Sequence, residues 1–133
     1  MLCRFNSQSR AFAIILKKDT VRKTYSKKRQ ELASSVFEEE SSQLIQNTIA
    51  LIEQYKPDCI HCFLPIHSKG EINTTPIIQY CWKNNINVLV PISNFEEGTL
   101  KNAEFGPHTK TKPTKNNITE PIDPIWKKND AID

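Results

Sequence analysis

The stretch Asp58-Cys-Ile-His-Cys-Phe-Leu-Pro-Ile-His-Ser-Lys-Gly-Glu-Ile-Asn-Thr-Thr75 decides how the rest of the chain is interpreted. It begins with a nearly continuous apolar run, residues 59–64, which predicts a strand covered on both faces. A polar loop follows, and Thr75-Pro76 is typical of a helix start, with Thr75 as N-cap. Glu71 is therefore expected near the carboxyl end of a buried strand, where ligands usually bind in open α/β sheets. A solvated loop acid is the alternative interpretation of Glu71.

The segments on either side of this stretch complete an α/β pattern. The strand at 59–64, a helix at 76–83 and a buried strand at 87–91 form a βαβ unit. This unit predicts that the two strands are parallel. We expect an α/β fold, a three-layer α/β/α arrangement with a mostly parallel sheet that is incomplete on its C-terminal side. The other predicted segments are helices at 18–32 and 35–56, the second with a Ser35/Glu38 capping box, a strand at 100–105, an exposed loop at 106–117 and an extended segment at 118–126.

Positive charge is concentrated at the start of the chain. Residues 1–30 hold nine Lys or Arg and one acid, so they carry +8, whereas the remainder carries −5. At 100° per residue, one stripe of the helix predicted at 18–32 holds Lys18, Arg22, Tyr25 and Arg29. Arg forks and a Lys point charge suit a polyphosphate, and a solvated basic face is the alternative.

Composition narrows the class of protein further. The chain has 133 residues, of which 38% are hydrophobic and 25% are charged, a typical soluble globular composition with no apolar run near the ~20 residues of a membrane span. Four cysteines do not make a disulfide scaffold, which favours a reducing compartment. Cys59 and Cys62 would diverge on a strand, so we predict no metal ligands in this chain. The three glycines form no phosphate loop.

Four short segments, taken in order, resemble one enzyme family. The family is 5-formyltetrahydrofolate cyclo-ligase, also called methenyltetrahydrofolate synthetase, and the resemblance covers roughly residues 17–133. The segments are Lys18-x-x-x-Arg22 with Arg29, Phe63-Leu-Pro-Ile ahead of Gly70-Glu-Ile-Asn-Thr, Val88-Leu-Val-Pro91, and Asn117-Ile-Thr-Glu-Pro121.

The resemblance implies an ATP- and Mg²⁺-dependent enzyme that converts 5-formyltetrahydrofolate to 5,10-methenyltetrahydrofolate, releasing ADP and phosphate. In the family's scheme the formyl oxygen attacks the γ-phosphate, N10 closes on the activated carbon, and phosphate leaves. No catalytic residue is assigned. Glu71 would hold the pterin, with Leu64 and Ile66 as the apolar wall beside it. The implied ATP-binding residues are Lys18, Asp19, Thr20, Val21 and Arg22.

The family also carries a later Gly-rich block that this sequence does not contain. We therefore expect residues 17–133 to be the N-terminal portion of a cyclo-ligase domain. Residues 1–16 form an N-terminal extension to which we assign no fold. It loosely resembles an organelle transit peptide, and a ragged or misassigned start is the alternative. Metal ligands are expected in the absent block, and the chain alone is expected to be marginally stable and a poor ATP binder.

The expected partners are the two small-molecule substrates, with no nucleic acid and no membrane, for a cytoplasmic monomer. Two alternatives stay open: an inactive βαβ fragment, and a basic-helix module that binds anions or nucleic acid.

Overall fold

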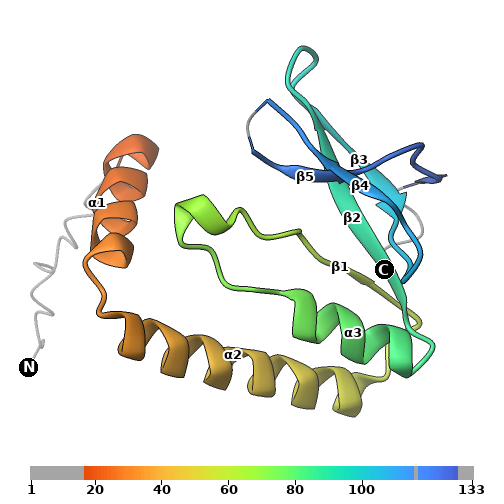
Figure 1. The fold of residues 1–133 in the computed structure, drawn as a ribbon, viewed down its shortest axis with the longest axis horizontal. Helices are drawn as coiled ribbons and strands as arrows, with labels where there is room; N and C mark the ends of the chain where they lie inside the picture. Colours follow the sequence, from red (N-terminus) through yellow and green to blue (C-terminus); the bar gives the residue numbers. More distant parts are fainter. Residues whose placement is uncertain (1–16, 116, 129–133) are drawn as a thin grey trace, which may run out of the picture. The chain divides into compact units, whose positions relative to one another are not determined.

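The computed structural model describes residues 17–115 and 117–128, and the chain divides into two compact units, Met1–Leu32 and Ala33–Asp133. The described part of the first unit is centred on one helix, α1 (Lys18–Gln30). The second unit contains α2 (Ser34–Tyr55), β1 (Cys59–His61), the 3₁₀ turn η1 (His67–Lys69), α3 (Thr75–Lys83), β2 (Asn87–Asn94), β3 (Thr99–Glu104), β4 (Thr111–Pro113), β5 (Thr119–Pro121) and β6 (Trp126–Lys127) (Figure 1).

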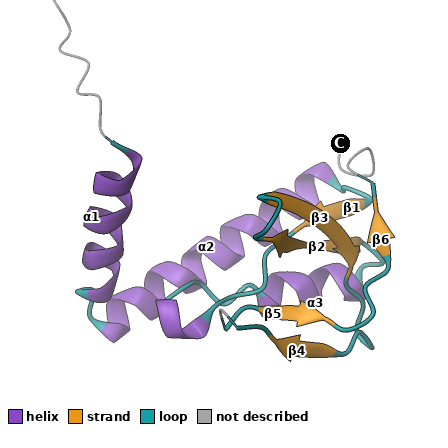
Figure 2. Ribbon diagram, turned by 90° about the horizontal axis from the view of Figure 1, so that it is seen from above, coloured by secondary structure: helices purple, strands orange, loops and turns teal. Residues whose placement is uncertain are grey.

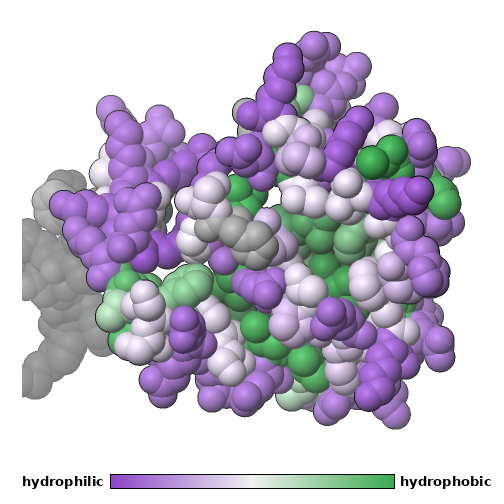
Figure 3. Space-filling model, in the orientation of Figure 1, coloured by the Kyte–Doolittle hydropathy of each residue, from purple (hydrophilic) through white to green (hydrophobic). Residues whose placement is uncertain are grey.

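Helix α1 confirms the first predicted helix, and none of its residues is buried. Basic residues fill its last turn, where positive charge is favourable beside the helix C-terminus. The face of α1 that is visible in Figure 3 is mostly hydrophilic. The predicted boundary between residues 16 and 17 coincides with the start of the described residues and stays a prediction, and the extension at residues 1–16 lies outside them.

The described strands form a four-stranded sheet in the order β1-β2-β3-β6 and a separate β4-β5 hairpin (Figure 2). Strands β1 and β2 are parallel, with His61 opposite Leu89, as the βαβ pattern predicts. The β2–β3 and β3–β6 pairs are antiparallel. The α/β class is confirmed, but the expectation of a mostly parallel sheet is wrong for the described strands, and the three-layer arrangement stays a prediction.

The orientation of β3 follows from the length of the connection before it. Only residues 95–98 separate β2 from β3. Such a short loop can close an antiparallel hairpin, whereas a parallel neighbour needs a crossover of about a dozen residues or more. Gly98, at a φ of 65°, provides the left-handed backbone conformation in this turn.

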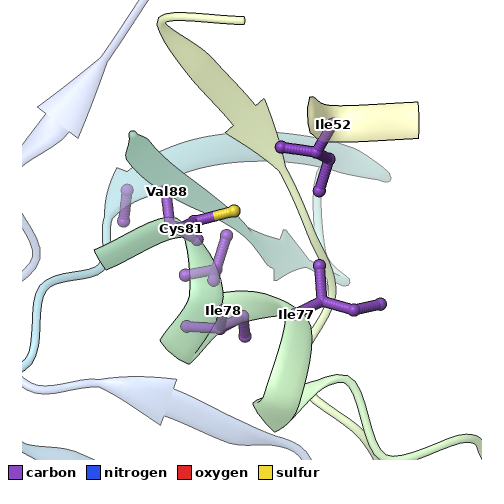
Figure 4. Close-up of a cluster of buried hydrophobic side chains, with 7 residues drawn as sticks. Ile52, Ile77, Ile78, Cys81 and Val88 are labelled. Carbon is purple, nitrogen blue, oxygen red and sulfur yellow. The ribbon is translucent and has the colours of Figure 1, made fainter. Parts of the chain in front are cut away.

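The core of the second unit lies where α3 packs on the sheet, and α2 packs on α3. Val88 and Val90 face the same side of β2, since side chains alternate along a strand, and Ala103 lies opposite Val90 on β3. The buried apolar cluster consists of Ile52 from α2, Ile77, Ile78 and Cys81 from α3, and Val88, Val90 and Ala103 from the sheet (Figure 4).

Both predicted helix caps need correction. Helix α2 begins at Ser34, and its N-cap residue, Ala33, has no side chain that could cap it. Ser35 is therefore inside the helix and forms no capping box with Glu38. The N-cap residue of α3 is Thr74 rather than Thr75, so Pro76 occupies the second helical position.

Strand β1 is shorter than the predicted 59–64, although the backbone N–H of Cys62 still donates to the Leu89 carbonyl at 2.9 Å. His61 is exposed, so the expectation of a strand covered on both faces is wrong at this position. The loop predicted at 106–117 contains the short, exposed strand β4. None of the helices in the described ranges is long and apolar enough to cross a bilayer.

Candidate functional site

Figure 1 shows the loop that joins β1 to α3. This loop carries Glu71, and two nested hydrogen bonds cross it. Glu71 Oε2 accepts a hydrogen bond from the Ile66 backbone N–H at 2.8 Å. Nearer the ends of the loop, the Thr74 hydroxyl donates to the Phe63 carbonyl oxygen at 2.8 Å. Because the 63–74 bond encloses the 66–71 bond, the partly buried Glu71 carboxylate is tied to the loop backbone rather than free in solvent.

Three apolar residues, Phe63, Leu64 and Ile66, precede Glu71 in the same loop. Leu64 is partly buried and packs against the hydrophobic core, which anchors the first residues of the loop. Ile66 is also partly buried, whereas the Phe63 side chain is 47% exposed. The loop therefore combines one oriented carboxylate with partly exposed apolar surface, a combination suited to a planar ligand with polar edges.

Two thiols lie close to the base of this loop. Burial raises the pKa of the Cys62 thiol, and a hydrogen bond with the Thr74 side chain offsets part of that effect. Burial, and secondarily the proximity of Cys62, raises the pKa of Cys81 to about 11. Both groups are free thiols and are held in the neutral form near pH 7. Among residues 17–115 and 117–128, no group of three or more His, Cys, Asp or Glu side chains could hold a metal ion.

The predicted ATP-binding residues occupy the first turns of α1. Four of the five, Lys18, Asp19, Thr20 and Arg22, are exposed, and Val21 is partly buried. Within the described part of the chain, neither Lys18 nor Arg22 forms an ion pair, so the positive charges of these two side chains are available to an anion.

Other cations of α1 are engaged locally. Lys27 lies 3.7 Å from the Glu31 carboxylate, one helical turn away. The Lys28 ammonium lies 5.3 Å from the ring centroid of Tyr25, a cation–π contact. At 100° per residue, Lys27 lies 180° around α1 from Lys18 and 140° from Arg22, and it lines a shallow hollow together with Arg22.

The two groups of predicted site residues lie in different units. Lys18–Arg22 belongs to the first unit, whereas Leu64, Ile66 and Glu71 belong to the second. The structure brings the second group together in one loop.

A separate hollow of about 360 Å³ lies at the opposite end of the sheet, where β2 begins and β3 ends. Asn87 and Val88 from β2 and Glu104 from β3 contribute to its wall. The indole N–H of Trp82, which also lines it, donates to the Phe105 carbonyl at 2.8 Å. This hollow contains none of the site residues predicted from the sequence.

Sequence reasoning missed Thr74, which is 4% exposed and links the two ends of the loop. The available signal was the pair of threonines before Pro76, but the N-cap role was assigned to the second of them. It also missed the Ile66 N–H as the group that orients Glu71, because a backbone donor leaves no mark in a sequence.

A comparison with protein-family models matches residues 14–132 to the 5-formyltetrahydrofolate cyclo-ligase family. The chain belongs to this family. A solved member of similar fold is the 5,10-methenyltetrahydrofolate synthetase of Aquifex aeolicus, determined by NMR, with a TM-score of 0.66 and 23% sequence identity. The match covers 89% of this cyclo-ligase family chain and 58% of the Aquifex chain. No curated protein matched the sequence.

Proposed function

We infer that this chain contributes nucleotide and folate contacts to an ATP-dependent 5-formyltetrahydrofolate cyclo-ligase, which converts 5-formyltetrahydrofolate to 5,10-methenyltetrahydrofolate. The observation that carries this inference is the family match across residues 14–132. The fold shared with a methenyltetrahydrofolate synthetase agrees with it. The chain spans 58% of the length of that solved relative, so the activity of the whole enzyme is part of the proposal.

In this proposal the basic stripe of α1 binds the ATP phosphates. Lys18 and Arg22 are exposed and unpaired within the described residues, so their charge can compensate phosphate charge as it shifts during transfer. Asp19, Thr20 and Val21 complete the ATP-binding segment. Phosphoryl transfer needs positioning and charge compensation more than covalent chemistry by the protein, and such a helix supplies both.

The folate would bind at the loop between β1 and α3. Glu71 has one carboxylate oxygen on the Ile66 N–H, which leaves Oε1 for the N–H donors of a pterin edge. Leu64 and Ile66 would form the apolar wall beside the ring. Mg²⁺ accompanies ATP in the proposed reaction, and the proposal assigns no Mg²⁺ ligand to the described residues, which contain no cluster of metal-binding side chains.

We place the reaction in the cytoplasm, in a monomer whose partners are its two small-molecule substrates. The support is the family chemistry together with the free thiols of Cys59, Cys62 and Cys81, since unpaired cysteines are typical of a reducing compartment.

The deciding experiment follows absorbance of methenyltetrahydrofolate when the protein is mixed with 5-formyltetrahydrofolate and MgATP, with calorimetric titration of each substrate. The proposal expects ATP-dependent product, or at least saturable binding of 5-formyltetrahydrofolate. Absence of both would reject it. Steeply salt-dependent binding to arbitrary DNA or RNA without folate binding would instead support the basic-helix module, a candidate favoured by the exposed cations of α1.

A matched pair of α1 variants tests the nucleotide role. Arg22→Ala should raise the Kd or KM for ATP about tenfold or more, because a charge-assisted contact to phosphate is lost, while folate affinity stays unchanged. Lys27→Ala removes the same charge from a side chain that lies 180° around the helix from Lys18 and is paired with Glu31, and it should change ATP affinity less than about twofold. Equal effects of both substitutions would indicate general electrostatic attraction rather than a specific contact.

A further inference from the structure

Thr74 stands at the N-cap of α3, but its side chain does not cap the helix. Its hydroxyl donates instead to the carbonyl of Phe63, eleven residues earlier, at 2.8 Å. Its own carbonyl accepts from the N–H groups of Ile77 and Ile78 at 3.1 Å each. Thr74 is therefore fixed to the first turn of α3 on one side and to the end of β1 on the other. The residue is 4% exposed, so water does not readily replace the hydroxyl.

The bond made by Thr74 closes the base of the loop that contains Glu71. The Phe63 carbonyl has one other partner, the Cys62 thiol at 3.6 Å, which is a weak donor. Without the hydroxyl, this carbonyl would lose its strong partner and the two ends of the loop would lose their direct link. The inner bond from the Ile66 N–H to Glu71 would then depend on a loop with an open base.

We propose that Thr74 is a positioning residue for Glu71: its hydroxyl holds the loop closed, so that the Glu71 carboxylate stays on the Ile66 N–H and presents Oε1 to the folate. The proposal rests on the proposed function, and it adds a residue that makes no contact with the substrate itself. Its effect passes from Phe63 through the loop backbone to Ile66 and then to the carboxylate.

The test uses the full chain with the substitutions Thr74→Val, which keeps the shape and removes the hydroxyl, and Thr74→Ser, which keeps the hydroxyl. Calorimetry with 5-formyltetrahydrofolate should show an increase in Kd of about tenfold for Thr74→Val, as expected when one buried hydrogen bond is lost. Thr74→Ser should stay within about threefold of the wild type. MgATP affinity should not change in either variant.

Thr75→Val is the matched control. Thr75 is the next residue and an exposed threonine, and no side-chain hydrogen bond of Thr75 occurs in the described structure. This substitution should leave folate affinity unchanged. If Thr74→Val does not fold, Thr74→Ala removes the hydroxyl without placing a second methyl in the buried site, and the same comparison is made with it.

Two further readouts separate positioning from general destabilisation. In a double-mutant cycle, Thr74→Val should have little additional effect on folate affinity in a Glu71→Gln background, because both changes act through the same carboxylate. The Ile66 amide should exchange its hydrogen faster in Thr74→Val than in Thr75→Val. Fully additive effects, or an unchanged exchange rate at Ile66, would overturn the positioning role.

The outcomes also separate this proposal from the one on which it rests. A wild-type protein that binds no 5-formyltetrahydrofolate overturns the proposed function, and the Thr74 role with it. A wild-type protein that binds the folate, with a Thr74→Val variant of equal affinity, overturns the Thr74 role alone.

Discussion

At the scale of the residue, Cys81 gives a pH-dependent prediction. Its thiol is fully buried among the side chains of the core, and its pKa is raised from 9.0 to about 11 (Figure 4). Because the folded protein holds the proton more tightly than the unfolded chain, the stabilisation is complete below about pH 9. It is lost as the pH rises toward about 11. One pKa unit corresponds to about 1.4 kcal/mol, so a shift of about two units amounts to a loss of roughly 3 kcal/mol.

Urea denaturation between pH 8 and pH 11 measures this loss. Cys81→Ala should flatten the decline in the free energy of unfolding over that interval, although it lowers stability at pH 7 by leaving a small cavity. Cys59→Ala, which changes a less buried thiol, should flatten it less. An equally steep decline in Cys81→Ala and the wild type would show that other groups set the alkaline limit.

Glu71 gives the residue-scale prediction for binding. In Glu71→Gln the amide oxygen can still accept from the Ile66 N–H, so the loop should keep its shape, but the negative charge on the pterin edge is lost. We expect a ten- to hundredfold increase in the Kd for 5-formyltetrahydrofolate, about the loss of a hydrogen bond to a charged group. Glu97→Gln, at an exposed acid in the β2–β3 turn, is the control, and unaltered folate affinity in Glu71→Gln would reject the role.

The position of a single residue in the fold could be predicted where the sequence patterns that decide it lie within a few residues on either side. Glu71 was expected in a loop between a strand and a helix, and it lies there, because an apolar run precedes it and a Thr-Thr-Pro helix start follows. Thr74 was not recognised, because two adjacent threonines can each cap a helix, and the choice depends on a carbonyl eleven residues away that only the folded chain brings near.

At the scale of the element, α3 connects the sheet to α2 through Ile77, Ile78 and Cys81. Ile78 is 2% exposed, so Ile78→Ala should lower the free energy of unfolding by about 2 to 5 kcal/mol through lost burial and the cavity left behind. Leu51→Ala on α2 removes a side chain that is 52% exposed and should cost within about 0.5 kcal/mol. Chemical denaturation of both variants measures the difference in their free energies of unfolding. Similar losses in the two variants would show that Ile78 is not part of the stabilising core.

The existence of the helices and strands could be predicted more fully than their pairing. Periodicity located α1, α2 and α3, and the apolar runs located β1 and β2, because both signals are local. The expectation of a mostly parallel sheet missed the antiparallel pairing of β3, although the short connection at residues 95–98 contained this information. The end of β1 and the N-caps of α2 and α3 depend on single hydrogen bonds. Their predicted positions differ from the structure by one or more residues.

At the scale of the whole molecule, the division at Leu32 and Ala33 predicts that the two units differ in stability. Helix α1 buries none of its residues, so a variant lacking residues 1–32 should keep the cooperative unfolding transition and the melting temperature of the second unit. The same variant should lose ATP affinity and retain folate binding. Calorimetric melting and titration measure both, and a lower melting temperature would show that the first unit supports the fold.

This division could not be predicted from the sequence. Composition distinguishes the basic first 30 residues from the rest, but a basic amphipathic helix can either pack on a domain or stand apart from it. Tyr25 and Leu32, two apolar side chains of the first unit, are 59% and 46% exposed.

The register of the parallel pair also determines what lies beside the loop that carries Glu71. Strand β2 pairs with β1 only up to Leu89 opposite His61, and then continues through Asn94 into the hairpin with β3. Five residues at about 3.3 Å each carry β2 roughly 16 Å past the end of its parallel neighbour. The end of β1 is therefore set back from the end of β2, and the β2–β3 hairpin projects beyond it.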